Sequence, residues 1–317
     1  MIYPGSQNRG VGMSIRSTLV SEFILRPNKL LYRLFRPSPK TIRSIIHPLS
    51  SIGNFLTLPS RGVLSEREDF DGVPGFVYHP KKKRDSRRIL VYLHGGGYCW
   101  GSSLSTHRIG LSNLARITGI SVYCVEYRLA PEHQFPAALD DSRKAWNDIV
   151  CRFPESEVLL AGDSAGGGLS LSLMMEIRND GGKLPDAAIL FSPWTDLTCS
   201  SESYNTKASA EPMFPRVAPE DHARLYVPEE IDNSIPEISP VNGSFKGLPR
   251  MLIIVGEREI LLDDSTRVGD KASGEGVDVR LDIWPKMFHD WWLFGFLVPE
   301  SGKCLREVAR WIHLSDE

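Results

Sequence analysis

The chain has 317 residues, a length that suits one large α/β domain or a domain with an accessory lid. Hydrophobic residues make up 41% of it and charged residues 24%, which excludes a disordered or fibrous protein. The formal net charge of −2 gives no overall electrostatic reason to bind nucleic acid. The charge is unevenly distributed, because residues 1–60 carry eight Lys or Arg and a single acidic residue, Glu22. This basic arm has a net charge of +7.

Two sequence features bear on where the protein works. The chain contains no window of 18 or more apolar residues, so we expect no transmembrane segment. Its N-terminus lacks the apolar run and small-residue cleavage site of a secretory signal. The five cysteines are scattered and form no C-x-x-C pair, which favours buried thiols in a reducing compartment over disulfides or a zinc site. These observations predict a cytoplasmic protein without a metal centre.

The basic arm also contains a cluster of apolar residues. The cluster consists of Leu19, Val20, Phe23, Ile24, Leu30, Leu31, Leu34 and Phe35. By itself, an acid-poor arm of this kind is typical of an organelle transit peptide or of a helix that contacts a membrane surface through residues 1–40.

From about residue 74, short β-rich runs alternate with helical patterns. Residues 75–79 and 88–93 are expected to form neighbouring strands, separated by the charged sequence KKKRDSRR, which we interpret as a solvated turn. The later expected strands are 121–126, 158–161, 187–191, 251–255 and 279–284. From residue 88 onward these runs are apolar without alternation, as in strands buried on both faces of a mostly parallel sheet. The pattern predicts an open, doubly wound α/β fold.

Two stretches interrupt this alternation. One is residues 1–60, and the other is residues 192–250, which contain seven prolines between Pro212 and Pro249. Irregular insertions of this length in compact enzymes are usually lids or binding loops. We therefore expect both stretches to form a cap over the carboxyl ends of the strands. The core then consists of residues 61–191 and 251–317.

The sequence AGDSAGG, residues 161–167, lies between an expected strand and a helical run. It is a G-x-S-x-G nucleophile elbow in the strand–turn–helix context that this motif requires. Ser164 must occupy a tight, strained turn, and Gly162 and Gly166 leave room where a Cβ would collide with neighbouring backbone. Ser164 is the predicted nucleophile.

A second motif, HGGGY, occupies residues 94–98 directly after an expected strand. Acyl transfer passes through a tetrahedral oxyanion, which needs preorganised N–H donors. A glycine run leaves its backbone N–H groups unshielded, and in this fold such a loop complements the N–H that follows the nucleophile. The expected oxyanion-hole donors are the backbone N–H groups of Gly95, Gly96 and Ala165.

These motifs, together with YRLAPEHQFPAALDD (127–141) and SPWTDL (192–197), resemble the hormone-sensitive-lipase-like branch of the α/β-hydrolases. The resemblance covers roughly residues 70–313. It implies an eight-stranded, mostly parallel sheet with a helical cap. It also implies hydrolysis of carboxylic esters of small molecules with short or medium acyl chains, without a cofactor. Relatives in this branch often dimerise, so a homodimer is left open.

The catalytic order on this fold is Ser, then acid, then His. Only His289, in KMFHDWW, lies in a loop after the last expected strand, where members of the branch place the catalytic histidine. The acid should follow the strand at 251–255, and Glu259 occupies the position where the branch commonly has Asp. A glutamate can orient and stabilise the histidine equally well. Asp263 is the alternative acid.

Three aromatic residues near these motifs, Tyr98, Trp291 and Trp292, are candidates for the walls of a substrate pocket or for the core. The leading functional interpretation is a serine esterase. The first alternative is a lactonase, an acyltransferase or a product-releasing hydrolase in small-molecule biosynthesis. The second is a non-enzymatic ligand-binding receptor on the same fold. The resemblance favours the cap interpretation of the basic arm, with the apolar side of the arm closing the active site.

Overall fold

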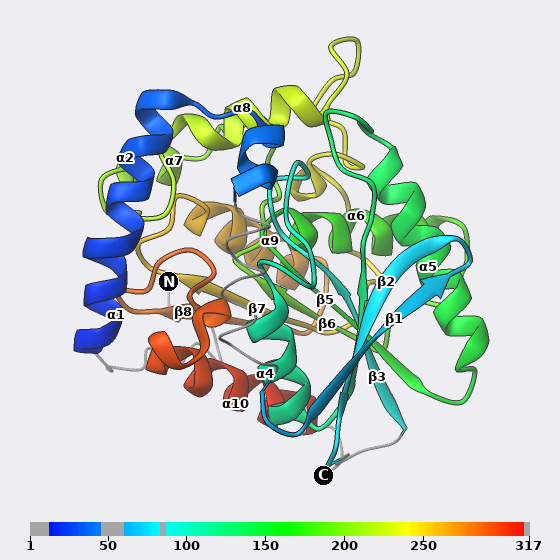
Figure 1. The fold of residues 1–317 in the computed structure, drawn as a ribbon. Helices are drawn as coiled ribbons and strands as arrows, with labels where there is room; N and C mark the ends of the chain where they lie inside the picture. The colour runs from blue at the N-terminus through cyan, green and yellow to red at the C-terminus, as the bar shows by residue number, and fades with distance from the viewer. Residues whose placement is uncertain (1–12, 46–59, 83–86, 314–317) are drawn as a thin grey trace.

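The structure is a computed structural model that describes residues 13–45, 60–82 and 87–313. Within this part of the chain, eight strands form one sheet in the order β1-β2-β4-β3-β5-β6-β7-β8 (Figure 1). The strands are β1 Val63–Phe70, β2 Val73–Pro80, β3 Arg88–Leu93, β4 Ser121–Val125, β5 Glu157–Asp163, β6 Ala187–Phe191, β7 Met251–Gly256 and β8 Val279–Trp284. Strand β2 pairs antiparallel with β1 and β4, and the other pairs are parallel. The predicted eight-stranded, mostly parallel sheet is confirmed.

Helices cover both faces of this sheet (Figure 1). The longer ones are α4 Arg108–Thr118, α5 Ala137–Arg152, α6 Ala165–Asn179, α9 Leu262–Gly274 and α10 Pro299–His313. Strand β3 is buried throughout, and its side chains alternate between two hydrophobic clusters. Val91 and Leu93 join the cluster beneath α5, α6 and α9, whereas Leu90 and Tyr92 join the one beneath α4 and α10. Burial on both faces explains the non-alternating apolar strands.

The prediction that the strands at 75–79 and 88–93 are neighbours is wrong, and one strand was missed. Strands β2 and β3 are not neighbours, because β4 lies between them and pairs with both. Strand β1 was not predicted at all, since its sequence VLSEREDF forms the edge of the sheet and most of its side chains are exposed or half-buried. Of the charged turn between β2 and β3, residues 83–86 lie outside the described part of the chain.

Most of the shorter helices belong to the two irregular stretches, 1–60 and 192–250. They are α1 Ile15–Leu19, a π-helical segment Val20–Leu25, α2 Arg26–Phe35, α7 Ser203–Thr206, α8 Val217–Tyr226 and a 3₁₀ turn, Pro240–Asn242. A second 3₁₀ segment, Trp291–Leu297, lies in the loop after β8. The two irregular stretches contact one another directly. Lys29 Nζ in α2 donates to the carbonyl oxygens of Ala208 and Glu211, and the ring of Tyr32 stacks on His222 of α8.

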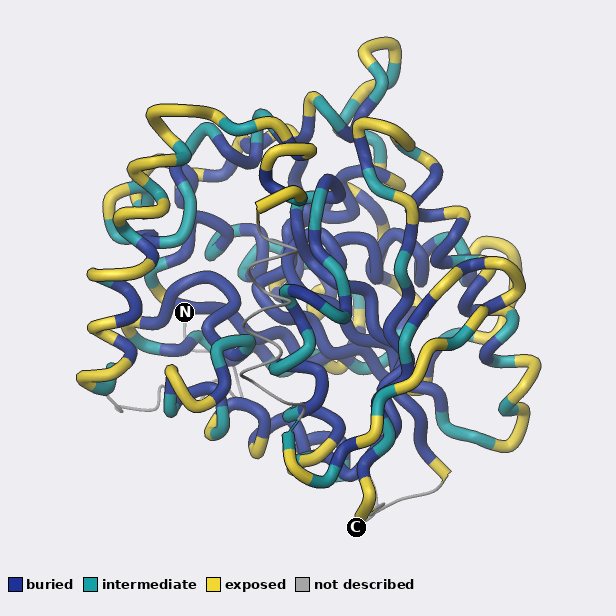
Figure 2. Tube along the Cα trace, viewed as in Figure 1, coloured by how far each residue is buried: buried dark blue, intermediate teal, exposed yellow. Residues whose placement is uncertain are grey.

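The apolar cluster of the basic arm does not face the sheet. Val20 is buried, but the other seven members are between 48% and 74% exposed. In Figure 2 the outward turns of α1 and α2, at the left edge of the view, are coloured largely as exposed. The expectation that the apolar side of the arm closes the active site is therefore wrong. The side of this helical segment that contacts the body of the protein carries the buried residues Ser17, Val20, Ser21 and Leu25.

Candidate active site

Ser164 lies between β5 and α6, where the chain turns sharply. Its φ of 51° is in the left-handed region, which is strained for a residue with a Cβ. A Cβ on Gly162 would lie 2.3 Å from the carbonyl oxygen of Gly166, and a Cβ on Gly166 would lie 2.0 Å from that of Leu93. Both positions therefore require glycine, as the elbow motif demands.

Glu259 and His289 come from the loops that follow β7 and β8. The Nδ1 atom of His289 lies 2.9 Å from Oε2 of Glu259, whose side chain is fully buried. The other carboxylate oxygen, Oε1, accepts hydrogen bonds from the Ser192 hydroxyl at 2.7 Å and from the Gly256 N–H at 2.5 Å. Glu259 is thus held in one orientation, and His289 is aligned by it.

The second ring nitrogen of His289 also faces a carboxylate. Its Nε2 lies 3.0 Å from Oδ2 of Asp290, the next residue, which adopts a φ of 50°. Burial would lower the pKa of His289, but the charge of Asp290 and hydrogen bonds to Asp290 and Glu259 raise it well above its usual value. Burial raises the pKa of Asp290 to about 7, and the charge of Asp163 adds to this while that of His289 opposes it. Among the described residues, no hydrogen bond joins Ser164 to His289.

The HGGG loop follows β3 and approaches the elbow. The Gly95 N–H donates to Oδ1 of Asp163 at 3.0 Å, so it is not available to an oxyanion, and the expectation for this donor is wrong. Gly96 and Gly97 have φ values of 119° and 59°, and within the described part of the chain their N–H groups have no hydrogen-bond acceptor. Ala165 is the first residue of α6, where N–H groups lack intrahelical partners.

Asp163 ties this loop to the elbow. Its carboxylate accepts hydrogen bonds from Tyr92 at 2.5 Å and from Gly95, and its Oδ2 lies 3.0 Å from Nε2 of His107. Burial would raise the pKa of Asp163, but the charge of His107 and hydrogen bonds from His107, Tyr92 and Asp290 lower it to about 2. The residue before the nucleophile therefore acts as a buried anchor for the glycine loop.

The remaining candidates from the sequence lie away from the reacting groups. Asp263 accepts a hydrogen bond from the Ser203 N–H at 2.8 Å. Tyr98 stacks on Tyr226 in the core, at 3.8 Å between ring centroids. Trp291 and Trp292 are fully buried in the cluster beneath α4 and α10. These contacts favour core positions for the three aromatic residues over pocket walls.

Two residues of the 192–250 stretch approach the histidine and were not singled out from the sequence. The ring of Phe214 meets that of His289 edge-on, with centroids 4.9 Å apart. Glu211 is fully buried, and within the described residues its Oε2 atom has no hydrogen-bond partner. Burial raises the pKa of Glu211 to about 7, opposed by the charge of His289 and reinforced by that of Glu259. The segment EPMF carries no periodicity that could have identified them.

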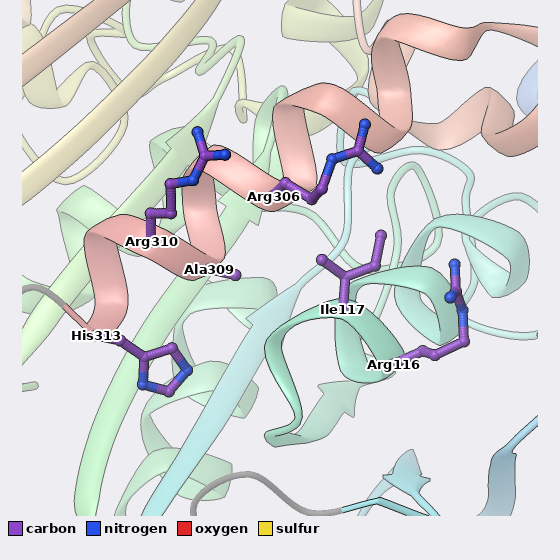
Figure 3. A pocket seen from close by; sticks show the side chains of 6 residues that line it. All are labelled: Arg116, Ile117, Arg306, Ala309, Arg310 and His313. Carbon is purple, nitrogen blue, oxygen red and sulfur yellow. The ribbon is translucent and has the colours of Figure 1, made fainter.

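A separate hollow of about 470 Å³ lies between α4 and α10 (Figure 3). It is lined by Arg116, Ile117, Arg306, Ala309, Arg310 and His313. This set contains no hydroxyl or thiol nucleophile, and Arg310 is paired with Glu307. In the described part of the chain, no group of three or more His, Cys, Asp or Glu side chains could hold a metal ion, and no helix is long and apolar enough to cross a membrane.

Comparison with known proteins gives the same picture as the motifs. Residues 90–293 match a family model described as the alpha/beta hydrolase fold. The chain is 38% identical over 227 residues to an "Acetyl-hydrolase" of Streptomyces hygroscopicus, covering 71% of this chain and 75% of that protein. It is 32% identical over 276 residues to "Carboxylesterase NlhH" of Mycobacterium tuberculosis, covering 81% and 85%.

The structural comparison extends over nearly the whole chain. A crystal structure of an esterase from the bacterial hormone-sensitive lipase family superposes with a TM-score of 0.84 and 31% identity, covering 95% of this chain and 98% of that one. The fold, the motifs and these esterase relatives favour the enzyme over the receptor alternative. The chain therefore belongs to the hormone-sensitive-lipase branch of the α/β-hydrolase family and is a carboxylic ester hydrolase.

Proposed function

We propose that Ser164, His289 and Glu259 form the catalytic triad of this esterase. The observation that carries the proposal is the 2.9 Å contact between Glu259 and His289 Nδ1. When the Nδ1–H of neutral His289 donates a hydrogen bond to Glu259, the free lone pair of the ring lies on Nε2. That nitrogen is the one that must accept the proton of the Ser164 hydroxyl.

The reaction then follows the acyl-enzyme route. Ser164 Oγ attacks the ester carbonyl carbon while His289 Nε2 takes its proton, and the carbonyl oxygen becomes an oxyanion. The oxyanion collapses, the bond to the alcohol oxygen breaks, and His289 returns the proton to the departing alcohol. Water, deprotonated by His289, then attacks the acyl carbonyl, and Ser164 leaves as the protonated hydroxyl. Each cycle consumes one water and releases one acid and one alcohol.

The N–H groups of Gly96, Gly97 and Ala165 are the proposed donors to the oxyanion. Gly97 replaces Gly95 in this set, because the Gly95 N–H is committed to Asp163. Backbone donors that are already in place need no reorganisation as negative charge develops on the oxyanion. Electrostatic stabilisation of the oxyanion is therefore typically the largest contribution to the rate enhancement.

Esters of small molecules with short to medium acyl chains are the proposed substrates. The similarity to a protein named acetyl-hydrolase supports the shorter end of this range. The Phe214 ring beside His289, from residues 192–250, supports a confined site. The contacts of Lys29 and Tyr32 with that stretch support a joint cap of residues 1–60 and 192–250, although its outward apolar face does not cover the nucleophile.

The test combines a covalent probe with two serine variants. A fluorophosphonate should label Ser164, and Ser164→Ala should abolish labelling and the hydrolysis of p-nitrophenyl acetate and butyrate. Ser172→Ala is the matched control, because this serine lies buried in the same helix, α6, and should leave both readouts unchanged. Measured on acetate, butyrate, octanoate and palmitate esters, kcat/KM should fall with acyl length. Hydrolysis that persists in Ser164→Ala would refute the assignment.

A further inference from the structure

The outer side of the N-terminal helical segment carries a row of large apolar side chains. Eight of them are between 48% and 81% exposed: Ile15, Leu19, Phe23, Ile24, Leu30, Leu31, Leu34 and Phe35. Single exposed apolar residues are ordinary, but contiguous apolar patches on soluble proteins mark sites of interaction. The row extends along α1, the π-helical segment and α2, on the side that Figure 2 shows as exposed.

The orientation of this segment is fixed by polar contacts on its inner side. Glu300 of α10 accepts hydrogen bonds from the Ser14 N–H at 2.7 Å and from the Ser17 hydroxyl. Arg258 Nη1 donates to the Ser21 hydroxyl at 3.2 Å. These polar contacts, together with the buried Val20 and Leu25, fix the inner side of the segment against the body, so the apolar row is held facing outward.

The π-helical segment keeps the two sides in register. Residues Ser17, Ser21 and Leu25 are all buried and are spaced by four. In a regular helix of 3.6 residues per turn, this spacing drifts steadily around the axis. The wider π turn reduces that drift. The inner row and the outer row, which includes Leu19 and Phe23, therefore stay on opposite sides over two turns.

Charge identifies the kind of surface that this row fits. Residues 13–45 contain seven Lys or Arg and a single acidic residue, Glu22. Several of these basic groups are engaged within the protein, since Arg26 pairs with Glu22 and Arg43 with Glu132, so the charge that the helical segment offers to a partner lies mainly on its two exposed arginines. Arg16 and Arg33 are exposed on the same helical segment as the apolar row. An apolar face flanked by Arg and Lys is the pattern of helices that lie in a membrane interface, with basic groups attracted to anionic headgroups.

The same charge argues against a second copy of the chain as the occupant. A two-fold interface places a patch against its own copy, so the basic arm of one chain would face that of the other. Juxtaposed like charges disfavour such a pairing. An anionic lipid surface can bury the apolar row in its interfacial layer and attract the arginines through its headgroups.

We propose that the outer face of α1 and α2 docks on the surface of an anionic phospholipid membrane, with the apolar row in the interfacial layer. The helix lies along the surface and does not cross it. Through Lys29, which binds the carbonyl oxygen of Glu211, docking brings the segment that contains Phe214, and with it His289, next to the lipid phase. An apolar ester dissolved in the membrane would then reach the site directly.

The experiment measures binding of the full chain to vesicles by flotation. Phosphatidylcholine vesicles containing phosphatidylglycerol should bind the protein, and vesicles of phosphatidylcholine alone should bind it at least ten-fold more weakly. Phe23→Ser/Leu34→Ser should lose at least ten-fold in apparent affinity on anionic vesicles. Arg16→Glu/Arg33→Glu should remove the preference for anionic lipid. Leu64→Ser, which changes an exposed apolar residue on β1, is the control and should bind normally.

All variants should hydrolyse dissolved p-nitrophenyl acetate at the wild-type rate, which separates this proposal from the triad assignment. Failure of the wild-type chain to bind anionic vesicles would overturn it. So would sedimentation of the wild type as a dimer that Phe23→Ser/Leu34→Ser converts to a monomer, because the apolar row would then be covered by a second copy.

Discussion

Replacing Glu259 by Gln tests the proposed triad most directly, because the surroundings of this side chain dictate how the amide must turn. Oε1 accepts hydrogen bonds from the Ser192 hydroxyl and the Gly256 N–H, and both donors lie within 2.7 Å. In Glu259→Gln the amide oxygen must remain at that position to accept them. The NH₂ group is then directed at His289 Nδ1, 2.9 Å away in the wild type.

The consequence is that the imidazole of His289 adopts the opposite tautomer. Nδ1 becomes the acceptor and the proton moves to Nε2, so the nitrogen that must accept the Ser164 proton can no longer do so. In serine-protease triads, the equivalent Asp→Asn change costs about 10⁴-fold in kcat, or about 5 kcal/mol of transition-state stabilisation. We expect a loss of the same order here, with a nearly unchanged melting temperature, since the amide keeps the size of the carboxylate.

Asp263→Asn is the matched control. Asp263 accepts one hydrogen bond from the Ser203 N–H, which an Asn oxygen can also accept. Its kcat on p-nitrophenyl acetate should stay within about three-fold of the wild type. The reasoning fails if Glu259→Gln retains more than about a tenth of wild-type kcat, or if Asp263→Asn loses as much as Glu259→Gln.

Three further predictions follow from buried contacts. In Asp290→Asn, loss of the negative charge at 3.0 Å from Nε2 should lower the pKa of His289, so the acidic limb of the kcat/KM–pH profile should move to lower pH; a limb that stays or moves to higher pH contradicts the charge argument. Gly166→Ala places a Cβ 2.0 Å from the Leu93 carbonyl oxygen and should destabilise the protein by about 3 kcal/mol or more in chemical denaturation, whereas Gly274→Ala, with open space around its Cβ, should not. Glu300→Ala removes the hydrogen-bond acceptor for Ser14 and Ser17, so hydrogen exchange in α1 should increase and the free energy that holds α1 in place should fall by about 1–3 kcal/mol. Unchanged exchange in α1 would show that this helix does not depend on the contact with Glu300.

Local patterns were enough to predict strands β2 to β8 and to select candidate residues at the carboxyl ends of these strands. The apolar runs gave the parallel strands, because burial on both faces leaves no polar alternation. The elbow was recognisable because two close backbone approaches at Gly162 and Gly166 admit no side chain. The chain order Ser, acid, His and the resemblance to the lipase branch pointed to Glu259 and His289, which follow β7 and β8, with Asp263 left as the alternative acid.

Other features depend on partners distant in the chain, which no local pattern encodes. The edge strand β1 was missed because its exposed polar side chains lack an apolar signature. The Gly95 N–H was assigned to the oxyanion because it belongs to the glycine loop, but it donates instead to the carboxylate of Asp163, 68 positions further along the chain. The apolar residues of the basic arm were expected to turn inward, since burial is their usual state. Polar contacts such as that between Ser14 and Glu300 instead hold the opposite side of the helix against the body.

The contact between His289 Nε2 and Asp290 depends on the proton that catalysis requires the histidine to lose. An ionised Asp290 only accepts hydrogen bonds, so its Oδ2 can bind Nε2 at 3.0 Å only while that nitrogen carries a proton. When His289 loses its Nε2 proton, the other proton stays on Nδ1, which is hydrogen-bonded to Glu259, and Nε2 becomes an acceptor. Where Asp290 is ionised, two acceptors then face each other and the contact breaks; where Asp290 is protonated, its hydroxyl can donate to Nε2 and keep the contact. His289 and Asp290 therefore titrate as a pair, and with Asp290 ionised the deprotonation that makes His289 a base also frees Nε2 for the Ser164 hydroxyl, so the acidic limb of the pH profile should report both groups together.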